Sequence, residues 1–141
     1  MKGTVLLMIA ASTLAMAGCN QAKPPAEVRH DVADAQIDGQ RDVAQAQAEV
    51  QDEMAAAQAD MQRARTDADP QAMEGAAQDV RETAAEGDYK VAVARAEATH
   101  KIATEKCNLL EGDAQRDCKQ RADNDLDNAK RAAETRRDGT G

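Results

Sequence analysis

An 11-residue repeat is the feature of this chain that most narrows its possible folds. The repeat occurs three times in succession, over residues 30–40, 41–51 and 52–62. Each copy places the same residue types at the same positions: Asp31, Asp42 and Glu53; Val32, Val43 and Met54; Ala33, Ala44 and Ala55; Ala35, Ala46 and Ala57; Gln36, Gln47 and Gln58. Eleven residues make three turns at about 3.67 residues per turn, close to a straight α-helix. The spacing therefore predicts one long, nearly straight helix over residues 26–69.

The apolar stripe along this predicted helix is narrow and is bordered by polar residues. At about 100° per residue, Val32, Ala35 and Gly39 fall within an arc of roughly 60°, and Gln36 lies at its edge. A stripe of this width can pack against one partner helix, but it cannot sit inside a globule. The acids of the repeat lie on one flank, where we expect them to be solvated. At about 1.5 Å per residue the helix would extend roughly 65 Å, which suits a spacer.

The composition excludes a large hydrophobic core. The chain has 141 residues but a single Tyr and neither Phe nor Trp, whereas a globular domain of this length normally buries several aromatic side chains. Its abundant Ala, Asp, Glu, Gln and Arg are typical of extended helices. We therefore expect an all-α protein.

No catalytic or metal centre is recognisable in the sequence. His30 and His100 are the only imidazoles, and neither has a nucleophile or a carboxylate at a spacing that would enforce a catalytic pair. The many acids lack the apolar walls that tune carboxylates for acid–base catalysis. A net charge of −8 and the lack of aromatic side chains for base stacking disfavour nucleic-acid binding. We expect no enzyme activity, no catalytic residue, no metal or other cofactor and no small-molecule substrate.

The repeat decays before Pro70, which predicts a helix boundary. Proline lacks a backbone donor and disrupts a helix interior, whereas Asp69 can cap a new helix with Pro70 at its first position. The next helix has few large apolar residues and contains Gly75. We expect a helical connector over residues 70–88 that ends at Gly87–Asp88.

The C-terminal segment, residues 89–141, has the pattern of a helical hairpin. Apolar or small residues first recur at alternating steps of four and three, as in a heptad seam: Tyr89, Val93, Ala96, His100, Ala103, Cys107 and Leu110. Gly112 then suits a left-handed helix end, and Asp113 suits the N-cap of a second helix over residues 114–137. One face of that helix carries Cys118, Ala122, Leu126, Ala129 and Ala133.

Two cysteines lie on opposite arms of this hairpin. Cys107 precedes Gly112 by five residues and Cys118 follows it by six, so antiparallel helices would bring them level. In an exported protein such a pair is expected to oxidise, and we predict a Cys107–Cys118 disulfide. A metal site that combines both cysteines with His100 is the alternative, but it lacks the Cys-x-x-Cys clip of structural zinc sites.

The N-terminus has the pattern of a secretion signal. Lys2 precedes an uncharged stretch over residues 3–18, which is shorter than the roughly 20 residues that a membrane-spanning helix needs. Met16-Ala17-Gly18-Cys19 resembles the lipobox of bacterial lipoproteins, although the first lipobox position is usually Leu. The resemblance implies that residues 1–18 are removed and that Cys19 is acylated. An ordinary secretion signal followed by a chance cysteine is the alternative.

This resemblance also implies a location. Residues 19–25 would form a tether from the acyl group, and Asn20 in place of Asp favours the outer membrane, facing the periplasm, in a Gram-negative organism. The run from Tyr89 to Cys118 resembles a Cys-stapled helical hairpin of uncharacterised exported proteobacterial proteins, which implies an envelope protein without a known activity. The chain is also loosely similar to small helical lipoproteins such as the murein lipoprotein. It lacks their C-terminal Lys, so we do not expect covalent attachment to the wall.

Together these patterns favour a non-enzymatic, lipid-anchored envelope lipoprotein that acts as a helical spacer or interaction scaffold. Acylated Cys19 would hold it to the membrane, the repeat helix would set a distance, and the hairpin would form a compact distal unit. The Ala/Val/Met stripe would mediate self-association or the docking of a helical protein partner. Two alternatives stay open: a hydrophilic stress protectant of the periplasm that is partly disordered in dilute solution, and an accessory subunit of an envelope enzyme.

Overall fold

The structure, a computed structural model, describes residues 21–139. Within that range it contains no strand and three α-helices: α1 (Pro25–Asp67), α2 (Pro70–Cys107) and α3 (Gly112–Asp138). The predicted all-α fold, with a long repeat helix and a disulfide-linked C-terminal hairpin, is confirmed. The predicted signal peptide and the predicted lipid-attachment residue Cys19 lie outside the described residues.

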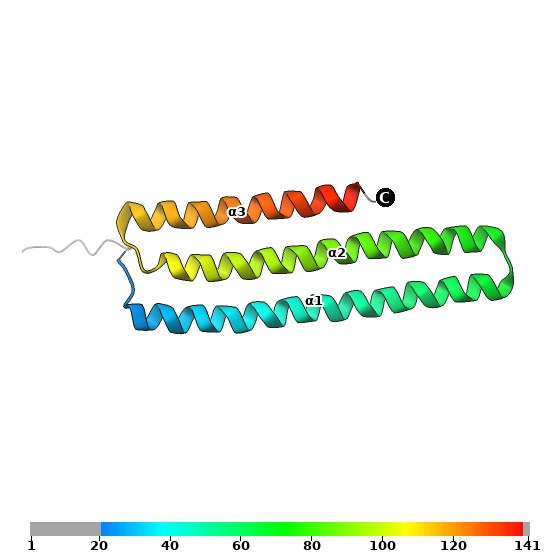
Figure 1. Cartoon of the computed structure of the whole chain (residues 1–141), viewed down its shortest axis with the longest axis horizontal. Helices are drawn as coiled ribbons and strands as arrows, with labels where there is room; N and C mark the ends of the chain where they lie inside the picture. The colour runs from blue at the N-terminus through cyan, green and yellow to red at the C-terminus, as the bar shows by residue number, and fades with distance from the viewer. Residues whose placement is uncertain (1–20, 140–141) are drawn as a thin grey trace, which may run out of the picture.

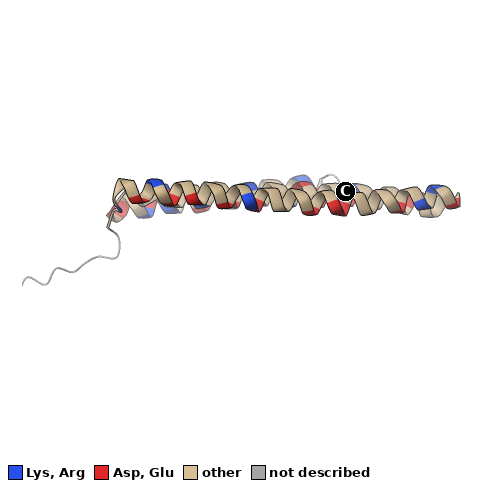
Figure 2. Cartoon of the chain, turned by 90° about the horizontal axis from the view of Figure 1, so that it is seen from below, with Lys and Arg blue, Asp and Glu red and all other residues tan. Residues whose placement is uncertain are grey.

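The three helices lie side by side in a single layer, with α2 in the middle (Figure 1). Neighbouring helices run antiparallel, and over residues 21–139 no Cα atom of α1 lies within 8 Å of one in α3. Seen edge-on, the layer is flat (Figure 2). Because α2 separates the other two helices, each seam is formed by two helices, and no other part of the described chain covers either broad face of the layer.

The 11-residue stripe of α1 faces α2. Its members are buried or half-buried along the whole helix: Val28, Val32, Ala35, Gly39, Val43, Ala46, Val50, Met54, Ala57, Met61 and Ala64. Gln36, at the edge of the stripe, is exposed. The stripe therefore packs on a single helix, as its width predicts, and the chain itself supplies that helix.

The face of α2 that meets this stripe also repeats every 11 residues. Two sets recur at that spacing, namely Ala76, Gly87 and Ala98, and Val80, Val91 and Ile102. A Cβ atom built on Gly39 would lie 2.6 Å from Cβ of Ala98. One built on Gly87 would lie 2.5 Å from Cγ1 of Val50. These two contacts are separated by one repeat on each helix, so equal repeats on antiparallel helices keep the two stripes in register.

Helix α2 is continuous from Pro70 to Cys107, so the expected helix end at Gly87–Asp88 is wrong. The connector expected over residues 70–88 is helical, but it forms one helix with the first arm of the hairpin. Glycine lowers helix stability because its backbone is freer in the unfolded chain. Here the missing side chain of Gly87 lets α2 approach Val50 of α1, and this packing outweighs the local propensity.

The turn between α1 and α2 agrees with the prediction. Ala68 adopts a left-handed conformation with φ +53° and ends α1. The side chain of Asp69 then caps α2 by accepting hydrogen bonds from the backbone N–H groups of Gln71 (2.9 Å) and Ala72 (3.3 Å). Pro70 is the first residue of α2, where its missing donor has no helical partner to lose.

The predicted heptad seam of α2 faces α3, and the Cys107–Cys118 disulfide joins the two helices, with Cα atoms 5.6 Å apart. Helix α2 ends at Cys107, however, so Leu110 belongs to the turn rather than to the seam. The N–H group of Leu110 donates to the carbonyl of Cys107 at 3.0 Å, which closes a tight turn. Gly112 has φ +57°, the left-handed conformation that the sequence predicts for it.

The start of α3 differs from the prediction by two residues. Helix α3 begins at Gly112, the residue before it is Glu111, and no side chain caps it. Asp113 is therefore inside the first turn, where it forms an ion pair with Arg116. A negative charge in this turn still complements the helix dipole, which explains why the same residue type suits both positions.

The segment before α1 meets the α2–α3 turn. The backbone N–H of Lys23 donates to the carbonyl of Asn108 at 2.7 Å. Because α2 returns along α1, the disulfide-linked turn lies at the same end of the layer as residues 21–24, and the α1–α2 turn lies at the opposite end (Figure 1). The expectation that the hairpin forms a distal unit is therefore wrong.

Candidate functional site

The two cysteines form a structural link rather than a reactive centre. Cys107 is 1% exposed, and its partner Cys118 is half-buried. Because both sulfur atoms are in the disulfide, they do not act as ligands together with His100. Among residues 21–139, no three His, Cys, Asp or Glu side chains are placed to hold a metal ion. No helix in the same range is both long and apolar enough to cross a membrane.

Both histidines have carboxylate partners that the sequence reading missed. His100 lies on the α2–α3 seam, with Nε2 2.6 Å from Oδ1 of Asp123, and the hydroxyl of Thr104 lies 3.5 Å from the same nitrogen. A catalytic relay needs the acid and the nucleophile on opposite ring nitrogens, so this group lacks that geometry. His30 is exposed and pairs with Asp34 at 3.0 Å. The spacing of four residues between His30 and Asp34 is typical of a side-chain pair on one face of a helix, so this pair could have been predicted from the sequence.

The acid at one position of each 11-residue repeat pairs with a lysine. Nζ of Lys101 lies 2.8 Å from Oδ2 of Asp42, and this pair joins α2 to α1. Nζ of Lys90 lies 2.6 Å from Oε1 of Glu53 and joins the same helices. In the first copy, Asp31 accepts a hydrogen bond of 2.8 Å from Nζ of Lys23, which precedes α1. The repeat acids are thus partly exposed, as expected, but they also connect separate parts of the chain.

These hydrogen bonds shift the titration of the lysines. The bond to Asp42 is the largest cause that raises the pKa of Lys101, and the bond to Glu53 is the largest cause for Lys90. The pKa of Lys23 is raised chiefly by its bond to Asp31. A raised lysine pKa means that the folded state favours the charged ammonium group.

We call the side of the layer that carries these pairs the bridged face. Its interhelical ion pairs are Asp42–Lys101 and Glu53–Lys90 between α1 and α2, and Glu97–Lys130 and Glu86–Arg137 between α2 and α3. Their α2 members are separated by four, seven and four residues, which places them on one side of that helix. The two α1–α2 pairs are separated by 11 residues on each helix, so they repeat with the same register as the glycine contacts.

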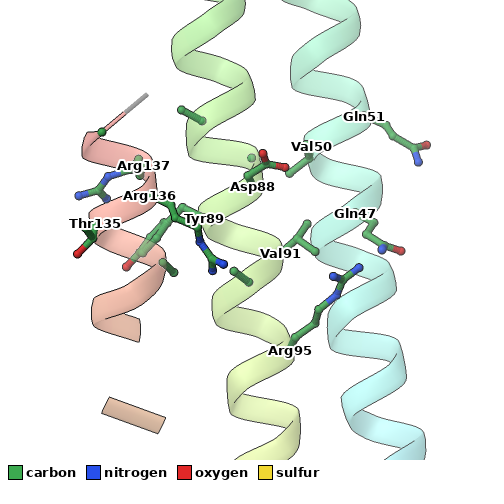
Figure 3. A pocket seen from close by; sticks show the side chains of 15 residues that line it. Gln47, Val50, Gln51, Asp88, Tyr89, Val91, Arg95, Thr135, Arg136 and Arg137 are labelled. Atoms are coloured by element: carbon green, nitrogen blue, oxygen red, sulfur yellow. The ribbon is translucent and has the colours of Figure 1, made fainter. Parts of the chain in front are cut away.

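A groove opens on the opposite face of the layer, where all three helices contribute (Figure 3). It has a volume of about 900 Å³. Its polar lining comes from Gln47 and Gln51 of α1, Asp88, Tyr89 and Arg95 of α2, and Thr135, Arg136 and Arg137 of α3. Arg137 lies at the edge of the groove and also reaches Glu86 on the bridged face. The repeat glutamines lie on the flank of the α1 stripe opposite to the repeat acids, which places the groove away from the bridged face.

Tyr89, the one aromatic residue of the chain, lies in this groove. The guanidinium carbon of Arg137 is 4.6 Å from the centroid of the Tyr89 ring, a distance typical of a cation–π contact. Arg137 also donates from Nε to Oδ1 of Asp138 at 2.9 Å, and this bond is the largest cause that raises the pKa of the guanidinium group. Both contacts hold Arg137 in place at the edge of the groove.

The groove has the chemistry of a polar recognition surface. Arg95 is exposed, and Figure 3 shows Arg95 on α2, Gln47 on α1 and Arg136 on α3 among the side chains that line the groove. Guanidinium and amide groups donate hydrogen bonds to carboxylates and peptide carbonyls. The groove can therefore donate hydrogen bonds to a polar or acidic segment. The sequence reading missed this site because its residues come from three helices whose mutual placement no local pattern predicts.

Comparisons of the chain with protein-family models, with curated proteins and with solved structures found no match.

Proposed function

We propose that the protein is a non-enzymatic, lipid-anchored envelope lipoprotein that acts as a helical spacer and interaction scaffold. The resemblance of residues 16–19 to a lipobox supports acylation of Cys19, and Asn20 supports an outer-membrane location facing the periplasm. The observation that carries the spacer role is that α2 returns along the whole of α1. A helix of 43 residues spans about 65 Å at about 1.5 Å per residue, and the second helix braces this length against bending.

In this proposal the groove, rather than the stripe of α1, is the surface that binds a protein partner. Helix α2 already covers the stripe, so a second copy or a partner helix would have to displace it. The groove stays open and presents exposed Arg95 beside the glutamines of α1. Because guanidinium groups bind carboxylates, we assign to this groove a protein partner with an acidic segment.

The mass of the protein extracted from a bacterial envelope tests the anchor. We expect a chain that begins at Cys19, carries acyl groups and shows two thiols only after reduction. Cys19→Ser is the matched variant, and we expect it without acyl groups and in the soluble fraction. A wild-type chain without acyl groups would contradict the proposed anchor.

Circular dichroism of the acyl-free chain separates a spacer from a stress protectant. We expect high helicity in dilute solution that does not depend on protein concentration, because the stripe packs within one chain. Low helicity that rises only on drying would support the protectant instead.

Chemical cross-linking in intact envelopes tests the scaffold role. We expect Arg95→Glu to lose the cross-linked partner, because a carboxylate in the groove repels an acidic segment. Arg41→Glu is the matched control, since Arg41 pairs with Asp38 on α1 and does not line the groove. Loss of the partner in both variants, or in neither, would contradict the assignment of the groove.

A further inference from the structure

Two adjacent leucines are exposed on the α2–α3 turn. Leu109 and Leu110 keep 46% and 39% of their surface accessible. Among residues 21–139 the other exposed large apolar side chain is Ile37, at 50%, which stands alone on α1. Single exposed apolar residues are ordinary on a protein surface. Two neighbours on one tight turn, in a chain this poor in large apolar residues, form a patch that needs a reason.

Several backbone groups of this turn are already hydrogen-bonded within the protein. Its N–H groups bond inside the turn, where those of Asn108, Leu109 and Leu110 donate to the carbonyls of Glu105, Lys106 and Cys107. The carbonyl of Leu110 accepts a bond of 2.9 Å from Nε2 of Gln115, a side chain only 4% exposed. A segment that contacts lipid must satisfy such groups internally. One side of this turn can therefore move from water into contact with lipid while those hydrogen bonds stay formed.

The turn also lies beside the start of the described chain. The N–H of Lys23 bonds to the carbonyl of Asn108, the residue directly before Leu109. Lys23 follows Cys19 by four positions, and a chain extends at most about 3.6 Å per residue. Four steps of that length do not exceed about 14 Å. An acyl group on Cys19 would thus keep Leu109 close to the membrane surface.

We propose that Leu109 and Leu110 rest on the lipid surface beside acylated Cys19 and give the rod a second contact with the membrane. This inference rests on the proposed lipid anchor. The anchor raises the effective concentration of lipid at the turn, so two leucines suffice for a contact that they would not hold alone. Exposed Glu111 follows them directly, which keeps the contact at the level of the headgroups. Two contacts at one end orient the long axis, whereas a tether alone leaves the rod free to tilt.

Photo-crosslinking of the full acylated protein tests this contact. The protein is inserted into vesicles of phosphatidylethanolamine and phosphatidylglycerol, of which a fraction carries a diazirine close to the acyl carbonyl. After reduction, trypsin releases the α2–α3 turn as peptide 107–116 and the α1–α2 turn as peptide 66–81. We expect lipid adducts on peptide 107–116 at about ten times the level on peptide 66–81, because only the first lies at the anchored end.

The matched variant is Leu109→Ser/Leu110→Ser, which keeps the backbone bonds and the disulfide. We expect its turn adducts to fall about fivefold while helicity and vesicle retention stay unchanged. Undiminished adducts in a folded variant would overturn the inference. So would wild-type adducts that are equal on both peptides while the protein stays on the vesicles, a result that leaves the anchor standing. A wild-type chain that does not stay on the vesicles removes the anchor and the inference together.

Discussion

Gly87 of α2 lies against Val50 of α1 with no room for a side chain between them. A Cβ atom on Gly87 would lie 2.5 Å from Cγ1, 3.2 Å from Cγ2 and 3.4 Å from Cβ of Val50. Valine has one strongly preferred χ1 rotamer in a helix, and both of its methyl groups are close, so rotation of the side chain does not open a space. The close approach of the two helices at this point therefore depends on the glycine.

We expect Gly87→Ala to lower the free energy of unfolding by about 1 kcal/mol, as the balance of two effects. Alanine improves helix propensity by roughly 1 kcal/mol, but overpacking against Val50 costs roughly 1–3 kcal/mol. Gly75→Ala is the matched control, because nothing lies within 4 Å of its Cβ position. We expect that change to stabilise the protein by up to about 1 kcal/mol. Urea unfolding followed by circular dichroism measures both changes.

The Val50→Ala background tests the cause. There the added methyl group fills the space that the valine vacates, so we expect Gly87→Ala to be neutral or stabilising. The coupling energy between the two sites would be about 1 kcal/mol. An equal loss in both backgrounds would show that the contact with Val50 is not the reason.

Gly39→Ala should destabilise the protein more than Gly87→Ala does. Its added Cβ atom would lie 2.6 Å from Cβ of Ala98 and 3.2 Å from Cα of the same residue. A Cα atom moves only with its helix, so α1 and α2 must separate locally, and we expect a loss of roughly 2–3 kcal/mol. The same urea titration measures it. A smaller loss than that of Gly87→Ala would mean that the helices slide past each other at little cost.

The repeat of α1 was easy to predict, whereas the matching repeat of α2 was hidden. The α1 repeat keeps acids, alanines and glutamines in register, and a single helix conformation explains all of them. In α2 some positions of the 11-residue repeat are occupied by small residues such as Ala76 and Gly87. Residues this small do not stand out as an apolar stripe in the sequence. A second stripe on the opposite side of α2 packs on α3 and contains larger residues, so it dominates the sequence pattern. From the sequence alone, Gly87 therefore indicates a helix end. Its close contact with Val50 explains why a glycine lies inside the helix instead.

The charge pairs illustrate the same limit. The partners of Glu53 and Asp42 lie 37 and 59 residues further along the chain, on a helix that returns antiparallel. No local spacing connects residues that far apart. The disulfide, by contrast, was predictable because Cys107 and Cys118 flank one short turn, and so was the cap at Asp69. Contacts between residues that flank one short turn of the chain could thus be predicted from the sequence. Contacts that depend on which helix returns along which other helix could not.

Alkaline pH should weaken the contact between α1 and α2. The bonds to Glu53 and Asp42 raise the pKa of Lys90 and Lys101 in the folded state. The two ion pairs therefore contribute their full stabilisation below the pKa of a lysine in the unfolded chain, about 10.4. This stabilisation is lost as the pH rises through the higher pKa of the lysines in the folded protein. We expect the urea midpoint of the acyl-free chain to stay level from about pH 8 to pH 10 and to fall above that.

Lys90→Arg/Lys101→Arg is the matched control for the alkaline loss. Arginine stays protonated throughout this range, so we expect the double variant to keep more of its stability above about pH 10.4. A loss of the same size in the variant and the wild type would show that other groups cause it. Added salt should weaken the same pairs at neutral pH, because it screens exposed charges.

Removal of the disulfide should loosen α3 far more than α1. Within residues 21–139, helix α3 packs only on α2, and the disulfide closes the turn between them with a sequence separation of 11 residues. In the chain-entropy model a loop of this size contributes roughly 3 kcal/mol. We expect Cys107→Ala/Cys118→Ala, or reduction of the wild type, to raise amide hydrogen exchange throughout α3. Helix α1 and the first half of α2 should stay protected, because their seam does not involve α3.

Hydrogen exchange can also contradict this prediction. Equal deprotection of α1 and α3 would mean that the layer unfolds as one unit, in which case the α1–α2 seam does not stand alone. Unchanged protection of α3 would mean that its seam with α2, including the His100–Asp123 and Glu97–Lys130 pairs, holds it without the disulfide. Local loosening is the expected result, because among residues 21–139 a flat layer gives α3 one neighbour. The α3 side of this seam is mostly alanine, so the seam buries too little apolar surface to replace a covalent link.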